Sequence, residues 1–239
     1  MGIAQRIQAA VLGKLLHWPR FNRLLARHLR SPAGLFGRWT ARLMNQSNAA
    51  MNERAVALLD IRTGQHVLDA GFGGAPALRE MISLVGREGK VVGLDASATM
   101  VERAERQFEQ FVKVGRLVLV EGAVEQMRFP EAHFDGAITV NTIYFWSDPA
   151  KGLARLYHVL KPGGRLVVGI RSAEEMRKMP FTAEGFTLYT PEQVEALLRE
   201  AGFVQVYAEQ VGGRPLGHVS VAGVKPFHVN ERPEFRGEA

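Results

Sequence analysis

From residue 66 onward, short runs of β-branched residues alternate with helix-length amphipathic segments. This alternation is typical of a parallel sheet covered by helices, because each parallel strand needs a long crossover to reach the next. We expect seven strands, near residues 66–70, 90–95, 117–121, 136–140, 165–170, 204–209 and 218–224. A short Gly-Gly-Arg-Pro loop joins the last two, which suits an antiparallel hairpin. The sequence therefore predicts an α/β fold, a doubly wound seven-stranded sheet with an antiparallel last strand.

Signals for the ends of helices agree with this pattern. Ser97, Asp148 and Thr190 are N-cap residues at the expected helix starts, and Gln193 completes a capping box with Thr190. The Lys-Pro-Gly-Gly stretch at residues 161–164 is expected to end the helix that follows Asp148.

The composition indicates one packed core and limits the chemistry. Hydrophobic residues make up 46% of the 239 residues, and there is no cysteine, which excludes disulfides, thiolate zinc sites and a cysteine nucleophile. The histidines do not form a cluster in the sequence, so we expect no metal site. Because no apolar run is long enough to span a bilayer and no secretory signal is visible, we expect a cytoplasmic protein.

The net charge of +6 comes from the N-terminus. Residues 1–52 hold eight Lys or Arg and no acid, whereas the remaining chain holds 22 basic and 24 acidic residues. The apolar residues of this N-terminal segment recur at helical spacing, which predicts a helical cap that packs on the sheet domain, contacts an anionic membrane peripherally or receives an acidic substrate. Nucleic acid is a less suitable partner, because the rest of the chain is not basic.

The stretch VLDAGFGGAP, residues 67–76, is the strongest indication of a ligand site. A strand that ends near Asp69 runs into Gly71 and Gly73, so backbone N–H groups lie at the carboxyl edge, where open α/β sheets bind ligands. The next strand ends at Asp95, at a spacing that suits a carboxylate accepting hydrogen bonds from ribose hydroxyls. Pro76 occupies the place of the third glycine of the dinucleotide pattern, which favours adenosylmethionine over a dinucleotide.

Five segments in this order carry a resemblance to a known family: VLDAGFGG, VVGLDASATMVERA, EGAVEQMRF, FDGAITVNTIYFWSDP and LYHVLKPGGRLVVG. Together they resemble the class I S-adenosylmethionine-dependent methyltransferases, in particular the small-molecule enzymes related to those of quinone and sterol methylation. The resemblance implies a Rossmann-like sheet and S-adenosyl-L-methionine as cofactor. By position it makes Asp69, Gly71 and Gly73 the contacts of the methionine end and Asp95 the ribose contact, with Ala96 and Met100 close to the adenine.

Two positions depart from the family pattern. Many relatives have Gly-Asp-Ala where this chain has Gly122-Ala123-Val124, so the backbone of Ala123 and Val124, or nearby Glu125, is expected to meet the adenine. Ala75 replaces a frequent third glycine, a change that we expect the start of a helix to tolerate.

The acceptor side is expected after the fourth strand and before Thr190. We predict that Asn141 orients the cofactor or the substrate and that Tyr144 and Trp146 wall the catalytic pocket, with a role in the core alone as the alternative for these aromatic residues. A covering segment carries Met176, Met179, Pro180, Phe181, Phe186 and Tyr189, which favours an apolar or aromatic acceptor or packs on the core. Asn45, Asn48 and Asn52 share a helical face that is expected near the methionine end of the cofactor or at the surface.

The sequence thus predicts an S-adenosylmethionine-dependent methyltransferase that moves a methyl group to a small, apolar, aromatic or lipid-like acceptor by in-line displacement. The expected parts are a basic helical cap at 1–52, a cofactor-binding domain at 53–225 and a polar tail at 226–239. A nucleotide-dependent oxidoreductase and a non-catalytic nucleoside-binding module are the alternatives, and oligomerisation is left open.

Overall fold

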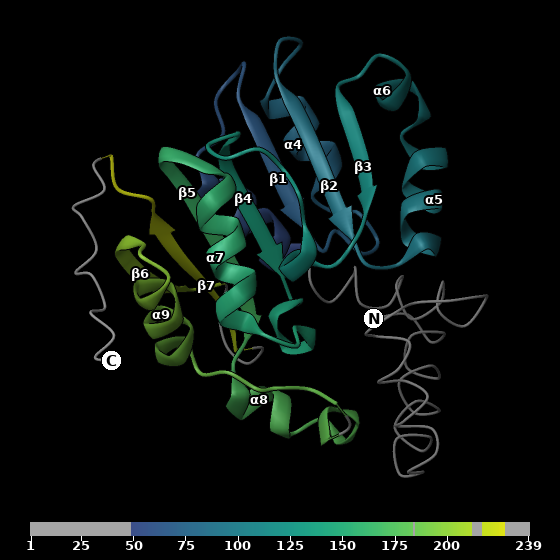
Figure 1. Ribbon diagram of the computed structural model, residues 1–239. Helices are drawn as coiled ribbons and strands as arrows, with labels where there is room; N and C mark the ends of the chain where they lie inside the picture. Colours follow the sequence, from purple (N-terminus) through teal and green to yellow (C-terminus); the bar gives the residue numbers. More distant parts are fainter. Residues whose placement is uncertain (1–48, 184, 212–216, 228–239) are drawn as a thin grey trace, which may run out of the picture.

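The protein is built around a seven-stranded sheet, seen in the computed structural model, which describes residues 49–183, 185–211 and 217–227 (Figure 1). The strand order is β3-β2-β1-β4-β5-β7-β6. β7 runs antiparallel to both of its neighbours, and the other adjacent pairs are parallel. The strands are β1 His66–Ala70, β2 Lys90–Asp95, β3 Leu117–Glu121, β4 Phe134–Val140, β5 Leu160–Arg171, β6 Val204–Gln210 and β7 His218–Val224. The predicted doubly wound sheet with an antiparallel last strand is confirmed.

Helices cover both faces of the sheet, which buries the apolar strands on two sides. On one face lie the helical residues 49–59, α4 Leu78–Leu84, α5 Ala98–Gln107 and α6 Glu109–Lys113. On the other face, in front of the sheet in Figure 1, lie α7 Pro149–Val159 and α9 Pro191–Glu200. Short elements follow the strand ends: η1 Val124–Gln126, η2 Ile143–Phe145, α8 Ala173–Arg177 and η3 Pro180–Ala183.

The helix caps follow the sequence signals in two of three cases. The Asp148 side chain accepts from Lys151 N at 2.9 Å, and Thr190 and Gln193 form the predicted capping box. Ser97 occupies the N-cap position of α5 without a side-chain capping hydrogen bond, and its backbone N–H donates to Asp95.

The Lys-Pro-Gly-Gly stretch belongs to a strand and does not itself end α7. The helix stops at Val159, and β5 begins at Leu160, which pairs with Phe134 ahead of a register shift in β4. The stretch is held from the other side as well, because Gly163 N donates to Lys225 O at 2.8 Å. This pairing makes β5 five residues longer at its start than the apolar run predicts.

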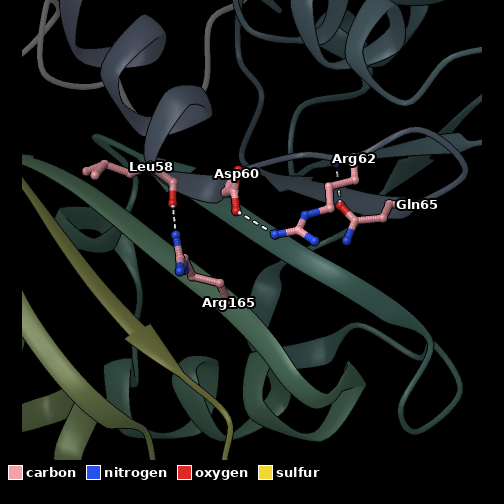
Figure 2. A network of polar contacts seen from close by, with 5 residues as sticks. All are labelled: Leu58, Asp60, Arg62, Gln65 and Arg165. Carbon is pink, nitrogen blue, oxygen red and sulfur yellow. Dashed lines mark hydrogen bonds and ion pairs between the residues drawn. The ribbon is translucent and has the colours of Figure 1, made fainter.

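The helical residues 49–59 are fastened to the sheet at their C-terminal end, as Figure 2 shows. Arg165 Nη1 of β5 donates to the carbonyl of Leu58 at 2.6 Å, and Arg62 N donates to Gln65 Oε1 in the turn that leads to β1. The boundary predicted between residues 52 and 53 falls inside this helix. The basic segment up to residue 48 and the tail from residue 228 lie outside the described residues.

Candidate active site

The glycines of the turn after β1 serve different purposes. Both have positive φ, +85° at Gly71 and +50° at Gly73. A Cβ at Gly71 would overlap Cγ2 of Thr142, whereas a Cβ at Gly73 would meet no heavy atom within 4 Å. Gly71 therefore lets the loop after β4 approach, and Gly73 borders open space at the carboxyl edge of the sheet.

Asp95 at the end of β2 fixes this turn. Its Oδ2 accepts from Gly73 N at 2.7 Å and its Oδ1 from Ser97 N at 2.9 Å. Burial raises the pKa of this carboxyl, and the two backbone N–H groups act against that shift. Since a carboxylate oxygen accepts more than one hydrogen bond, Asp95 keeps acceptor capacity for hydroxyl groups beside Gly73.

Asp69 lies in β1 on the same face of the sheet as Asp95. Only 3% of the residue is exposed, and burial, followed by the charge of Asp95, raises the pKa of Asp69 to about 8. A buried carboxylate of this kind is stabilised by a cation at close range. Asp69 could thus pair with an ammonium group, and Asp95 could accept from hydroxyl groups.

Ala75 departs from the expectation that a helix start would tolerate it. α4 begins only at Leu78, two residues after Pro76, and Ala75 adopts a φ of +60° in the turn before it. That conformation costs a residue with a Cβ about 1 kcal/mol more than glycine. The third glycine of the family pattern is missing at a position whose backbone still favours glycine.

The residues expected beside the adenine differ in exposure. Ala96 is exposed, Ala123 is half-buried, and Val124 and Met100 are buried at 6% and 1% exposure in the apolar clusters. Glu125 Oε1 accepts from both the N–H and the hydroxyl of Ser147, at 2.8 and 3.0 Å. Glu125 thereby links η1 to the loop after β4, and Ala123 is more accessible than Val124.

Asn141 and Tyr144 meet at the end of β4, while Trp146 points elsewhere. Asn141 has a φ of +58°, and the Tyr144 hydroxyl lies 3.2 Å from Asn141 Oδ1. Burial raises the pKa of Tyr144, so its phenol stays protonated at neutral pH. The Trp146 ring packs on α7, where a Cβ at Gly152 would lie 2.7 Å from it. This packing favours the core interpretation of Trp146.

Arg171 and His218 join this group, although the sequence analysis did not assign them a role. The Arg171 N–H donates to the Tyr144 hydroxyl, which also lies 3.1 Å from Arg171 O. Its guanidinium donates to His218 Nε2 from Nε and Nη2, at 3.1 and 2.8 Å. Burial and the nearby guanidinium lower the pKa of His218 to about 4, so the imidazole is a neutral acceptor. The available signal was a single arginine at the carboxyl end of an apolar strand.

The segment between β5 and α9 covers η2 with aromatic side chains. Phe186 lies 4.7 Å from Phe145, 6.0 Å from Phe181 and 6.2 Å from Tyr144, measured between ring centroids. Thr187 N donates to Tyr144 O at 3.0 Å. α8 begins this segment beyond the carboxyl ends of the central strands (Figure 1). Met176 and Tyr189 are buried in the core, so the segment supplies both packing and the aromatic cluster.

Two further expectations concern the helix before β1 and metals. Asn52 is half-buried, and Asn45 and Asn48 lie outside the described residues. Within the described ranges, no group of three His, Asp or Glu is arranged to hold a metal ion. No helix in these ranges is long and apolar enough to cross a bilayer.

Comparison with protein families matches residues 67–164 to a methyltransferase domain. The chain is 29% identical over 132 residues to the uncharacterized methyltransferase YdaC of Bacillus subtilis, covering 55% of this chain and 70% of that protein. It is 34% identical over 108 residues to the ubiquinone/menaquinone biosynthesis C-methyltransferase UbiE of Psychromonas ingrahamii, covering 45% of this chain and 43% of that protein.

The fold is also found in solved structures. A SAM-dependent methyltransferase from Aquifex aeolicus superimposes with a TM-score of 0.63 at 23% identity, over 77% of this chain and 95% of that one. A putative methyltransferase of Haloferax volcanii, in complex with the Trm112 activator, gives a TM-score of 0.68 at 19% identity, over 78% and 93%. Residues 67–164 thus match a methyltransferase domain, and the seven-stranded fold of the chain is that of S-adenosylmethionine-dependent methyltransferases.

Proposed function

We propose that the protein transfers the methyl group of S-adenosylmethionine to a small, apolar or aromatic acceptor. The observation that carries the proposal is the open space at Gly73, whose N–H donates to Asp95, with the buried Asp69 on the same face of the sheet as Asp95. The methyltransferase domain matched at residues 67–164 argues against the oxidoreductase alternative. The matched part of the chain spans less than half the length of the UbiE relative, so the acceptor is proposed from the residues of this chain and is not taken from that relative.

The residues on the cofactor side fit the two ends of adenosylmethionine. When bound, the cofactor supplies an electrophilic methyl group on a sulfonium. Asp69 would pair with its ammonium group, an interaction that stabilises the ionised form of a carboxyl whose pKa is otherwise raised. Asp95 would accept from the ribose hydroxyls, and the extended backbone at Ala123 would meet the adenine.

On the acceptor side, the protein positions the reactants and excludes water. Asn141 and Tyr144 present an amide and a neutral phenol at the end of β4, beside the rings of Phe145 and Phe186. The protonated phenol does not act as a general base, so Tyr144 serves to position the acceptor. Holding the acceptor in line with the methyl carbon supplies most of the acceleration.

Calorimetric titration with adenosylmethionine, adenosylhomocysteine and NADH tests the cofactor assignment. We expect micromolar binding of the first two and none of NADH. Asp95→Ala should weaken adenosylhomocysteine binding by about tenfold or more, since hydrogen bonds to a charged group are lost. Asp60→Ala, at an exposed aspartate outside the site, is the matched control. Unchanged affinity in Asp95→Ala would contradict the ribose assignment.

Transfer of a labelled methyl group to a panel of quinols, phenols and lipids tests the activity itself. Binding of the cofactor without transfer to any acceptor class would favour the non-catalytic module, an alternative that the missing aspartate at Ala123 keeps open.

The basic segment 1–52 carries a separate proposal, a peripheral contact with anionic membranes of a cytoplasmic protein. Its eight basic residues and absence of acids support it. Deleting residues 1–30 should weaken sedimentation with phosphatidylglycerol vesicles. Equal sedimentation of the full and shortened chains would dismiss the contact.

A further inference from the structure

Arg171 is a half-buried cation at the edge of the candidate site. It is the last residue of β5 and is linked through the Tyr144 hydroxyl to Asn141, the residue that follows β4. Its side chain reaches His218 at the start of the neighbouring β7 and Met179 Sδ, 3.5 Å from Nη1. The guanidinium therefore lies on the acceptor side of the site and near the aromatic cluster.

The partners of this guanidinium are neutral. His218 accepts through Nε2 with a pKa lowered to about 4, and a thioether is a weak acceptor. Among the described residues, no Asp or Glu forms an ion pair with Arg171. Burial lowers the pKa of Arg171, and Tyr144 and Glu175 act against that shift, but the Glu175 carboxylate pairs with Lys178. Partial burial without an ion-pair partner leaves the charge poorly compensated.

The count of donors leaves room for an anion. A guanidinium carries five N–H groups, of which Nε and one each on Nη1 and Nη2 are engaged by His218 and Met179. One N–H remains on each terminal nitrogen, the number that a carboxylate accepts from arginine in a bidentate pair. If Arg171 served only to hold β5 to β7 through His218, these two remaining N–H groups would not be needed.

We propose that Arg171 binds a carboxylate carried by the acceptor, so that the protein methylates an aromatic or apolar acid. This inference rests on the proposed function in taking Asn141 and Tyr144 as the acceptor side. It adds a specificity determinant: the anion is held at the end of β5, and the apolar body of the acceptor lies toward Phe145 and Phe186.

Binding of acids and of their neutral amides tests the inference. Acetate, benzoate and 2-naphthoate are titrated against acetamide, benzamide and 2-naphthamide, with and without saturating adenosylhomocysteine. We expect the wild-type protein to bind at least one acid about tenfold or more tighter than its amide, and Arg171→Gln to remove this preference. Arg177→Gln, an exposed arginine of α8, is the charge-matched control and should retain it. The inference is overturned if none of the three acids binds more tightly than its amide. It is also overturned if Arg171→Gln keeps the wild-type preference for the acid.

A measurement on the unaltered protein covers the case in which Arg171→Gln fails to fold. The preferred acid should protect Arg171 from modification by phenylglyoxal, as read by peptide mass spectrometry, and its amide should not. Equal modification with acid and amide contradicts the inference. Adenosylhomocysteine affinity is read separately in Arg171→Gln and should stay within about twofold of the wild type, so failure of the cofactor assignment is distinguished from failure of the acid site.

Discussion

At the scale of single residues, the turn after β1 combines positions that serve the fold with positions that face the site. Gly71 and Gly73 look alike in the sequence, and both were predicted as cofactor contacts. In the structure Gly71 makes room for Thr142, and Gly73 borders open space beside Asp95. The two glycines should therefore respond differently to the same substitution.

Gly71→Ala should destabilise the fold by about 2–4 kcal/mol, because the added methyl overlaps Thr142 and φ is positive. Gly73→Ala should cost only about 1 kcal/mol in stability yet weaken adenosylhomocysteine binding. Urea unfolding and calorimetry separate the two effects. Thr142→Ser, which removes Cγ2, should partly restore Gly71→Ala and leave Gly73→Ala unchanged. Equal losses of stability in the two alanine variants would refute this distinction.

Asp69 should make the stability of the cofactor-free protein depend on pH. Its folded pKa of about 8 lies above the ordinary value of 3.8, so the folded state binds a proton more tightly than the unfolded state. The free energy of unfolding should therefore fall as pH rises from about 4 to about 8. Asp69→Asn should flatten that decline, and exposed Asp60→Asn should not. Parallel curves for the wild type and Asp69→Asn would rule out the raised pKa.

Ala75→Gly should stabilise the protein by about 0.5–1 kcal/mol, because glycine adopts the observed positive φ without strain. Ala77→Gly is the control, since Ala77 has a φ of −82° and is buried. The control should lose stability in thermal or urea unfolding. A loss of stability in Ala75→Gly as well would show that the left-handed conformation is not strained.

At the scale of elements, α7 depends at its C-terminus on a residue far along the chain. Lys225, just after β7, donates from Nζ to the carbonyls of Tyr157 and Leu160, at 3.0 and 2.8 Å. It also lies over the Tyr157 ring, 4.7 Å from the centroid. A cation beside the last carbonyls of a helix satisfies acceptors that have no partner within the helix. The end of β7 thus fastens the helix that packs on β4 and β5.

Lys225→Met should destabilise the protein by about 1–2 kcal/mol, because it removes hydrogen bonds from a charged donor to buried carbonyls. Lys151→Met, on the exposed side of α7, should stay within about 0.5 kcal/mol of the wild type. Chemical denaturation measures both. Equal effects at the two positions would argue against a capping role for Lys225.

At the scale of the whole molecule, the candidate site is assembled from strand ends that are remote in sequence. The proposed cofactor side and the proposed acceptor side meet where the parallel strands β1, β2, β4 and β5 end at one edge of the sheet. A ligand that contacts several of these ends should stabilise all of them together.

Adenosylhomocysteine at about 100 times its Kd should therefore raise the free energy of unfolding by about 2.7 kcal/mol, and NADH should not. The same experiment on Asp95→Ala, at equal ligand concentration, should show a smaller rise. Stabilisation by NADH equal to that by adenosylhomocysteine would contradict the cofactor assignment.

The amino-acid sequence by itself determined the seven strands and their order of appearance, two of the three helix caps and the location of the glycine turn. These features depend on hydrophobic periodicity and on neighbours within a few residues. The sequence pattern did not predict that β5 starts as early as Leu160, because this start depends on the pairing of Leu160 with Phe134 in the neighbouring strand β4.

Tertiary structure alone decided which candidates lie together. Tyr144 meets Asn141 and Arg171, Trp146 packs on Gly152, and Ala75 needs a left-handed backbone. His218, 47 residues after Arg171, becomes the neighbour of that arginine only when β7 pairs with β5. Contacts of this kind depend on the register between strands and on what lies over their ends, and neither is encoded in local spacing.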